Sequence, residues 1–121
     1  MIMKIRLTEC DEPFLGAGIV FTFTGEYPFD KDPVDFMLCQ YLAGKADRSD
    51  FAFYCISGYH AGSLEYVLPK EAQAENVKAI STQWLKDNWK SKVYGGCEAC
   101  DVMLSNWIWD QQEKYNQNKK E

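Results

Sequence analysis

Histidine is almost absent from this chain of 121 residues, in which His60 is the only one. Catalytic zinc sites need several protein ligands, usually with more than one histidine, so the sequence predicts neither a metal centre of that kind nor another cofactor. No stretch of the chain approaches the ~18 apolar residues of a membrane span. The charged, alternating N-terminus does not have the pattern of a secretory signal either. We therefore expect a cytoplasmic protein that makes no membrane contact.

Basic residues are the minority, with 13 Lys and Arg against 18 Asp and Glu and a net charge of −5. Nucleic acid repels such a chain unless basic residues are concentrated in one patch, and the sequence contains no such patch. The acidic excess lies in residues 1–60, where five basic residues face nine acidic ones. This balance argues against direct nucleic-acid binding and favours a basic partner.

The hydrophobic pattern predicts one α+β domain over residues 1–110, followed by a polar C-terminal tail over residues 111–121. Alternation with period two, rich in β-branched and aromatic residues, indicates strands. These runs span residues 3–8, 18–25, 34–41, 51–57, 63–68 and 102–109. We expect an antiparallel, twisted sheet of about five to six strands. A helical turn is the weaker alternative for residues 34–41, and the apolar run at 51–57 predicts a central strand covered on both faces.

One main helix is expected over about residues 81–93, packed on one face of the sheet. Ser81 is a suitable N-cap, and Gly95 with Gly96 would end the helix. Trp84, Leu85 and Trp89 share roughly one helical face and are expected to contact the sheet. Residues 70–76 favour a short helical turn. Trp107 and Trp109 favour the core, with interface anchors as the alternative.

The five cysteines are an odd number, which is typical of free thiols in a reducing compartment. Cys97 and Cys100 have a spacing that can hold zinc or carry out dithiol redox chemistry. A second ligand pair is missing, and the motif does not open a helix after a strand, so structural thiols are the favoured interpretation. His60 lies in a tight link between glycines, where an ordinary loop residue is favoured over a general base. No catalytic residue is predicted.

Carboxylates cluster around an aromatic, proline-containing loop. Glu26, Asp30, Asp32 and Asp35 fall within ten residues, beside Tyr27. Asp47 and Asp50 add further negative charge. Three interpretations remain open: a solvated loop, a binding face for a basic partner, and a catalytic or cation-binding pair. The prolines break any regular ligand spacing, and no EF-hand pattern is present.

Several short motifs resemble the bacterial immunity proteins of polymorphic toxin systems, most closely the group called immunity protein forty-five. The motifs occupy residues 57–62, 68–72 and 80–89, with Tyr94, Cys97 and the upstream segments 27–29 and 34–38. The resemblance covers about residues 10–104. These motifs are largely structural, so they speak for the fold more than for a site. His60 and the Cys97–Cys100 pair depart from the pattern, and the resemblance assigns them no role.

This resemblance implies a non-enzymatic immunity protein, of the kind found in contact-dependent inhibition. Such a protein would bind the toxic C-terminal domain of a cognate effector, which could be a nuclease, and block its active site or substrate groove. Carboxylates would steer the encounter and aromatic residues would anchor the complex. The expected partner-binding residues are Glu26, Tyr27, Asp30, Asp32, Asp35, Asp47, Asp50 and Tyr59. The alternatives are a small thiol enzyme or redox protein using Cys97 and Cys100, and a non-catalytic assembly adaptor or weak homodimer.

Overall fold

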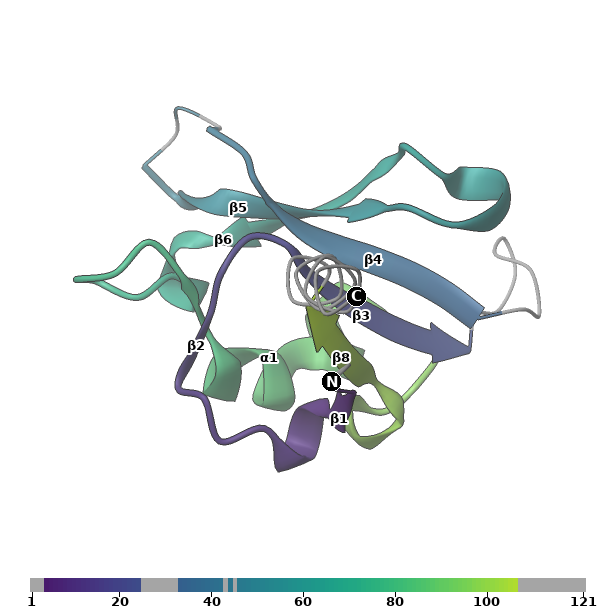
Figure 1. Cartoon of the computed structure of the whole chain (residues 1–121). Coiled ribbons are helices and arrows are strands. Elements are labelled where there is room, and N and C mark those ends of the chain that lie inside the picture. The colour runs from purple at the N-terminus through teal and green to yellow at the C-terminus, as the bar shows by residue number, and fades with distance from the viewer. Residues whose placement is uncertain (1–3, 25–32, 43, 45, 107–121) are drawn as a thin grey trace, which may run out of the picture.

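The computed structural model describes residues 4–24, 33–42, 44 and 46–106, and its main element is a six-stranded antiparallel sheet (Figure 1). The strands follow the order β1-β8-β3-β4-β5-β6 across the sheet. Their bounds are β1 Ile5–Arg6, β8 Met103–Asn106, β3 Ile19–Thr24, β4 Pro33–Gln40, β5 Arg48–Cys55 and β6 Leu64–Pro69. A second, two-stranded sheet pairs β2 (Phe14–Leu15) with β7 (Ile80–Ser81). The predicted α+β class and antiparallel sheet are confirmed.

Period-two alternation places one side of each long strand in the core. In β4, Val34, Phe36 and Leu38 are buried, whereas the residues between them are only half-buried. Phe36 lies opposite Phe21 of β3 on one side and Cys55 of β5 on the other. Directly opposed residues share a face of the sheet, so the register alone assembles a continuous apolar layer. The strand interpretation of residues 34–41 is thereby confirmed over the helical one.

The helix begins where the sequence predicts and changes geometry before its end. α1 spans Thr82–Asn88, and the hydroxyl of Ser81 accepts a hydrogen bond from the Trp84 amide at 3.2 Å. A π-helical segment, Trp89–Val93, continues it and is closed by the Tyr94 amide donating to the Trp89 carbonyl at 2.9 Å. Asn88, with φ of −119°, leaves helical geometry at the junction. The wider turn that follows re-aims the side chains after α1, as π-bulges commonly do.

The core is an aromatic cluster centred on Trp89, whose side chain is fully buried. Its ring stacks on Phe21 with centroids 5.6 Å apart and meets Phe23 and Phe53 edge-on at 5.4 and 5.8 Å. Leu85 is fully buried beside it, and Trp84 packs against the cluster with part of its surface exposed. The expectation that these three side chains join the helix to the sheet is confirmed.

Two N-terminal and connecting segments differ from their predictions in detail. The strand expected over residues 3–8 is reduced to β1, because the chain turns into a 3-10 helix at Leu7–Glu9 that buries Leu7 completely. The helical turn expected over residues 70–76 is a 3-10 helix at Lys70–Ala72. Trp107, Trp109 and the tail 111–121 lie outside the described residues.

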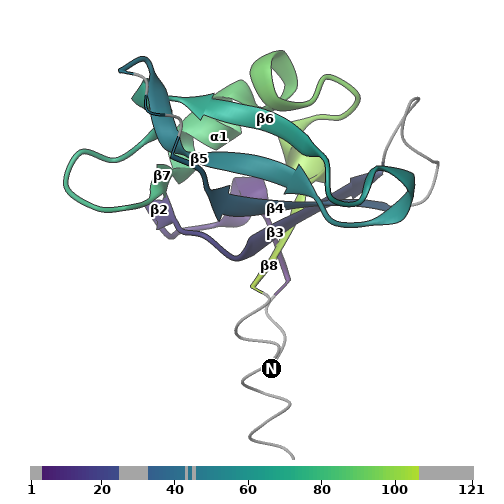
Figure 2. The same ribbon diagram turned by 90° about the horizontal axis from the view of Figure 1, so that it is seen from above.

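The sheet is covered by the helix on one side only. Figure 2 views the strands from the side opposite α1, and no described helix lies on that side. β5 is an interior strand, as predicted, with β4 and β6 as neighbours. Its predicted covering on both faces is not present in the described part of the chain. Phe51 and Phe53 pack into the core, whereas Ala52 and Tyr54 lie on the other side.

Candidate partner-binding surface

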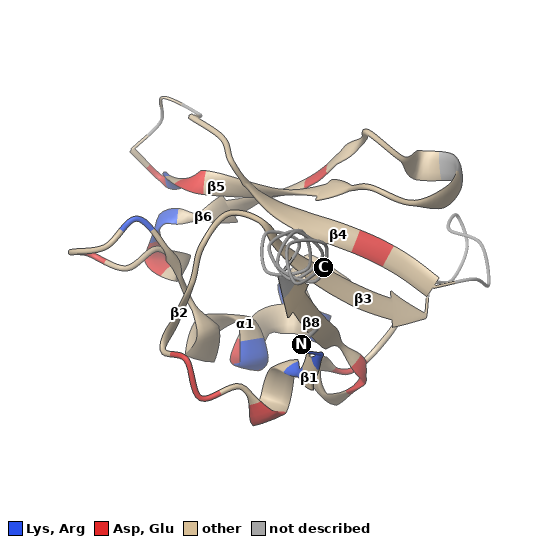
Figure 3. Ribbon diagram, in the orientation of Figure 1, with Lys and Arg blue, Asp and Glu red and all other residues tan. Residues whose placement is uncertain are grey.

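The structure separates the predicted carboxylates that it describes. Asp35 lies in β4, opposite Thr22, and its carbonyl accepts a hydrogen bond from Ile56. Asp50 lies in β5, where its carbonyl accepts a hydrogen bond from the amide of Tyr41. Positions 35 and 41 are six residues apart, so the two carboxylates are separated by about 20 Å along the strands. Figure 3 shows acidic segments toward both ends of β4 and β5 instead of one cluster.

Glu26, Tyr27, Asp30 and Asp32 fall in segment 25–32, which lies outside the described residues. The described residues on either side of it, Thr24 of β3 and Pro33 of β4, pair at the end of the sheet where Asp35 lies. Tyr59 belongs to a 3-10 helix, Gly58–His60, but its side chain is not among those described. The 3-10 helix follows β5 at the same end of the sheet. Of the predicted partner-binding residues, Asp35 and the 3-10 helix that contains Tyr59 thus lie at the same end of the sheet.

Hydrogen bonds hold Asp35 in place. The hydroxyl of Thr22 donates to Oδ1 of Asp35 at 2.5 Å, and the Asp35 amide donates to the Ser57 hydroxyl at 2.9 Å. The side chain is half-buried. Among the described residues, no Lys or Arg forms an ion pair with it. Asp35 therefore presents a fixed negative charge that nothing described neutralises.

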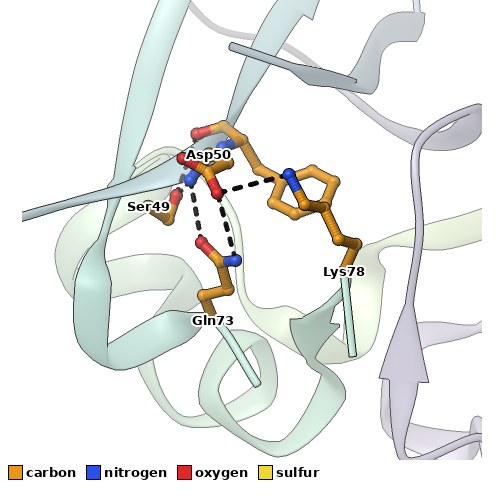
Figure 4. A network of polar contacts seen from close by, with 5 residues as sticks. Ser49, Asp50, Gln73 and Lys78 are labelled. Carbon is orange, nitrogen blue, oxygen red and sulfur yellow. Dashed lines mark hydrogen bonds and ion pairs between the residues drawn. The ribbon is translucent and has the colours of Figure 1, made fainter. Parts of the chain in front are cut away.

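Asp47 and Asp50, at the other end, are close to cations. Oδ2 of Asp50 lies 3.8 Å from Nζ of Lys78, and the side chain of Gln73 hydrogen-bonds both the amide and the carboxylate of Asp50 (Figure 4). Asp47 lies 3.8 Å from Arg48. A hollow of about 830 Å³ opens beside them. Its charged and amide lining side chains are Arg48, Asp50, Lys70, Glu71, Gln73 and Glu75. Mixed charge gives this hollow little preference for a partner of one sign.

His60 and the described carboxylates form no metal centre. Nδ1 of His60 lies 4.0 Å from Oε1 of Glu65, at the limit of an ion pair. Within the described ranges, no group of three or more His, Cys, Asp or Glu side chains is close enough to hold a metal ion.

All five cysteines are free thiols, and Cys97 and Cys100 have unlike surroundings. Cys97 is half-buried against the core, whereas Cys100 is exposed in a 3-10 helix, Ala99–Asp101. Burial raises the pKa of the Cys97 thiol. The adjacent Trp89 indole opposes that shift, although its contact with the sulfur falls short of hydrogen-bond geometry. A reactive dithiol needs a lowered thiol pKa, so the environment of Cys97 favours the structural interpretation.

The side of the sheet away from α1 brings Asp35 together with neighbours that the sequence analysis did not single out. We call this side the open face. Across β3, β4, β5 and β6 it includes Val20, Thr22, Asp35, Met37, Cys39, Ala52, Tyr54, Ile56, Leu64 and Val67, and Met103 and Ser105 of β8 lie opposite Thr22 and Val20. Ile56 and Leu64 are 40% and 42% exposed, and they are two of the few large apolar side chains in the described chain that reach solvent. The signal for this surface was the nearly unbroken apolar run at residues 51–57.

The described residues define a small α+β protein built on a six-stranded antiparallel sheet. The sequence profile of the family described as Immunity protein 45 matches residues 7–104. The chain therefore belongs to the immunity protein 45 family, which confirms the resemblance noted in the sequence. No match was found among curated proteins or among solved structures. None of the described helices is long and apolar enough to cross a membrane.

Proposed function

We propose that this chain is a cytosolic immunity protein that binds the toxic C-terminal domain of a cognate effector and blocks its active site or substrate groove. Membership of the immunity protein 45 family over residues 7–104 carries the proposal. A protein of this kind needs a stable surface and no turnover of its own. The free thiols fit a reducing cytosol.

The toxin class that best fits the charge of this chain is a nuclease with a basic substrate groove. A chain with a net charge of −5 can compete with nucleic acid for such a groove. We assign steering to Glu26, Asp30, Asp32, Asp35, Asp47 and Asp50, and anchoring to Tyr27 and Tyr59. Asp35 and the segment before it should dominate, since Asp47 and Asp50 already lie near Arg48 and Lys78.

Co-expression with the toxin domain encoded beside this gene tests the proposal. Cells that produce both proteins should form as many colonies as cells that carry an inactivated toxin. Cells that carry the toxin and a truncated copy of this gene should die. If the intact chain leaves survival at the level of the truncated copy, the chain is not the immunity protein for that toxin.

Charge reversal of Asp30, Asp32 and Asp35 to lysine should slow association with the toxin domain. Because steering acts over the whole encounter, we expect a decrease of about tenfold or more in the association rate at low salt. The dependence of that rate on salt should also flatten. Stopped-flow fluorescence across a range of salt concentrations would measure both effects.

The matched control reverses Glu9, Asp11 and Glu12, which are exposed and lie outside the proposed set. Both triple variants change the net charge equally. A steering site near Asp35 predicts the larger loss for the first variant. Equal losses would show that total charge, and not its position, controls the encounter.

A further inference from the structure

We propose that the open face is the surface on which the toxin domain docks, through an apolar patch of the toxin with a basic side chain opposite Asp35. This inference rests on the proposed immunity function and identifies the part of the molecule that performs it. It adds to the acidic steering residues a contact area that holds the complex together after the encounter.

The register of the sheet aligns apolar side chains across four strands. Val20 of β3 lies opposite Met37 of β4, Met37 opposite Tyr54 of β5, and Tyr54 opposite Leu64 of β6. Opposed side chains in an antiparallel sheet lie about 5 Å apart, so these four form one row, which crosses a β-bulge where β5 pairs with β6. Exposure increases along the row, from 7% at Val20 to 42% at Leu64.

A second row runs parallel to the first. Cys39 lies opposite Ala52, and Ala52 lies opposite Val67. Cys39 and Val67 are half-buried, and burial raises the pKa of the Cys39 thiol, which therefore stays neutral near pH 7. None of these seven side chains is charged. Glu65 falls at the bulge of β6 between Leu64 and Tyr66, and its carboxylate lies 4.0 Å from Nδ1 of His60.

This composition is unusual for the solvent side of a sheet. Antiparallel sheets that face water on one side normally alternate apolar and polar residues, with the polar ones outward. In Figure 3, β4 carries one acidic band, and β3 carries no charged residue. The apolar residues at 51–57 have the pattern of a strand covered on both faces, and the described chain covers only one. Contiguous apolar surface of this kind marks an interaction site, and tyrosine and methionine are enriched at such sites.

Asp35 defines the chemistry of the occupant. It lies at the edge of the apolar rows, beside Ile56, and is held by Thr22 and Ser57. No described Lys or Arg pairs with this carboxylate, and a desolvated charge without a partner is costly, so a partner that covers the face is expected to bring a cation to it. A second copy of this chain would bring another net charge of −5 and the same carboxylate to the interface. A toxin domain with a basic groove supplies the missing cation.

The test measures binding of the purified, catalytically inactivated toxin domain encoded beside this gene. In the test variant Tyr54 and Leu64, which are opposed on neighbouring strands, are both replaced by lysine. We expect the dissociation constant to rise about 100-fold, because charge is placed at the centre of an apolar contact. Val77→Lys is the single-lysine control for added surface charge, since Val77 is 50% exposed and lies outside the open face. It should bind like the unchanged chain.

A separate variant, Asp35→Asn, keeps the size of the side chain and removes its charge. Its affinity should fall about tenfold, with a flatter dependence on salt. Circular dichroism and thermal melting establish that each variant is folded. If the double variant does not fold, Ile56→Lys replaces it, since that side chain is already 40% exposed.

The outcomes separate this inference from the proposed function. If the unchanged chain does not bind the toxin domain, the proposed function fails and the inference fails with it. If the unchanged chain binds and the folded lysine variants bind equally well, the docking surface lies elsewhere and the immunity function stands. If sedimentation shows a dimer that the lysine variants dissociate while toxin binding persists, the face belongs to a second copy and our assignment is wrong.

Discussion

Replacing Trp89 with alanine should lower the free energy of unfolding by about 3–5 kcal/mol, as is typical when a buried tryptophan is removed from a core. The ring is fully buried and contacts Phe21, Phe23 and Phe53, which come from two strands of the sheet. Alanine would leave a cavity in the only aromatic cluster that joins the described helix to the sheet. Domains of this size have about 5–15 kcal/mol of stability in total, so the variant should retain little of it. Urea denaturation followed by circular dichroism measures the loss.

Two other substitutions show whether the loss of stability depends on the position of Trp89 or would follow from the removal of any tryptophan. Trp84→Ala removes a ring that is only partly buried, and it should cost about 1 kcal/mol, the usual size for such a site. Trp89→Phe keeps a ring in the cluster and removes an indole N–H that is buried without a well-formed hydrogen bond. It should cost less than Trp89→Ala. Equal losses for the two alanine variants would contradict the central role of Trp89.

The strands were predictable because each of them repeats a local pattern. In β3 and β4 every second residue is apolar, and a strand has the same period, so six or eight residues suffice to identify the element and its buried side. Ser81 marked the start of the helix for a similarly local reason, namely the hydrogen bond that its hydroxyl accepts from the Trp84 amide. Such features depend on neighbours along the chain.

The strand order could not be predicted, because it depends on contacts distant in the sequence. β8, the last described strand, lies between β1 and β3 and pairs with both. Nothing in residues 103–106 specifies those partners. The π-helical turn after Asn88 was also missed, since a periodic apolar face looks the same whether its last turn is α or π. Both features depend on how the helix and the strands pack against one another.

The candidate site could be predicted only in part from the sequence, for the same reason. Asp35 and Asp50 are 15 residues apart in the sequence and lie toward opposite ends of the β4–β5 pair. Met37, Tyr54 and Leu64 have similar separations, of 17 and 10 residues, and yet become neighbours through the register. A surface formed across strands requires the pairing to be known. The sequence could indicate an acidic protein that binds a partner, but not the face that it would use.

Aspartate substitutions at two adjacent residues of β4 should distinguish an effect on folding from an effect on binding. Leu38→Asp should abolish the folded state, because the side chain at this position is fully buried in the core. An unpaired carboxylate there must be desolvated or protonated, which costs more than about 4 kcal/mol together with the lost packing. Met37→Asp places the same group on the open face, where the side chain is half-buried. It should cost about 1 kcal/mol, as is usual for a site outside the core.

Thermal stability and toxin binding should respond differently in these two variants. Met37→Asp should melt close to the unchanged protein and yet bind the toxin domain much more weakly, since it adds charge to the middle of the apolar row and lies near Asp35. Leu38→Asp should lose both the melting transition and protection in the co-expression assay. Circular dichroism, thermal melting and calorimetric titration of the toxin domain distinguish the cases. A folded Met37→Asp protein with full affinity would remove the open face from the interface, whereas a folded Leu38→Asp protein would contradict the alternation of β4 from which the face was derived.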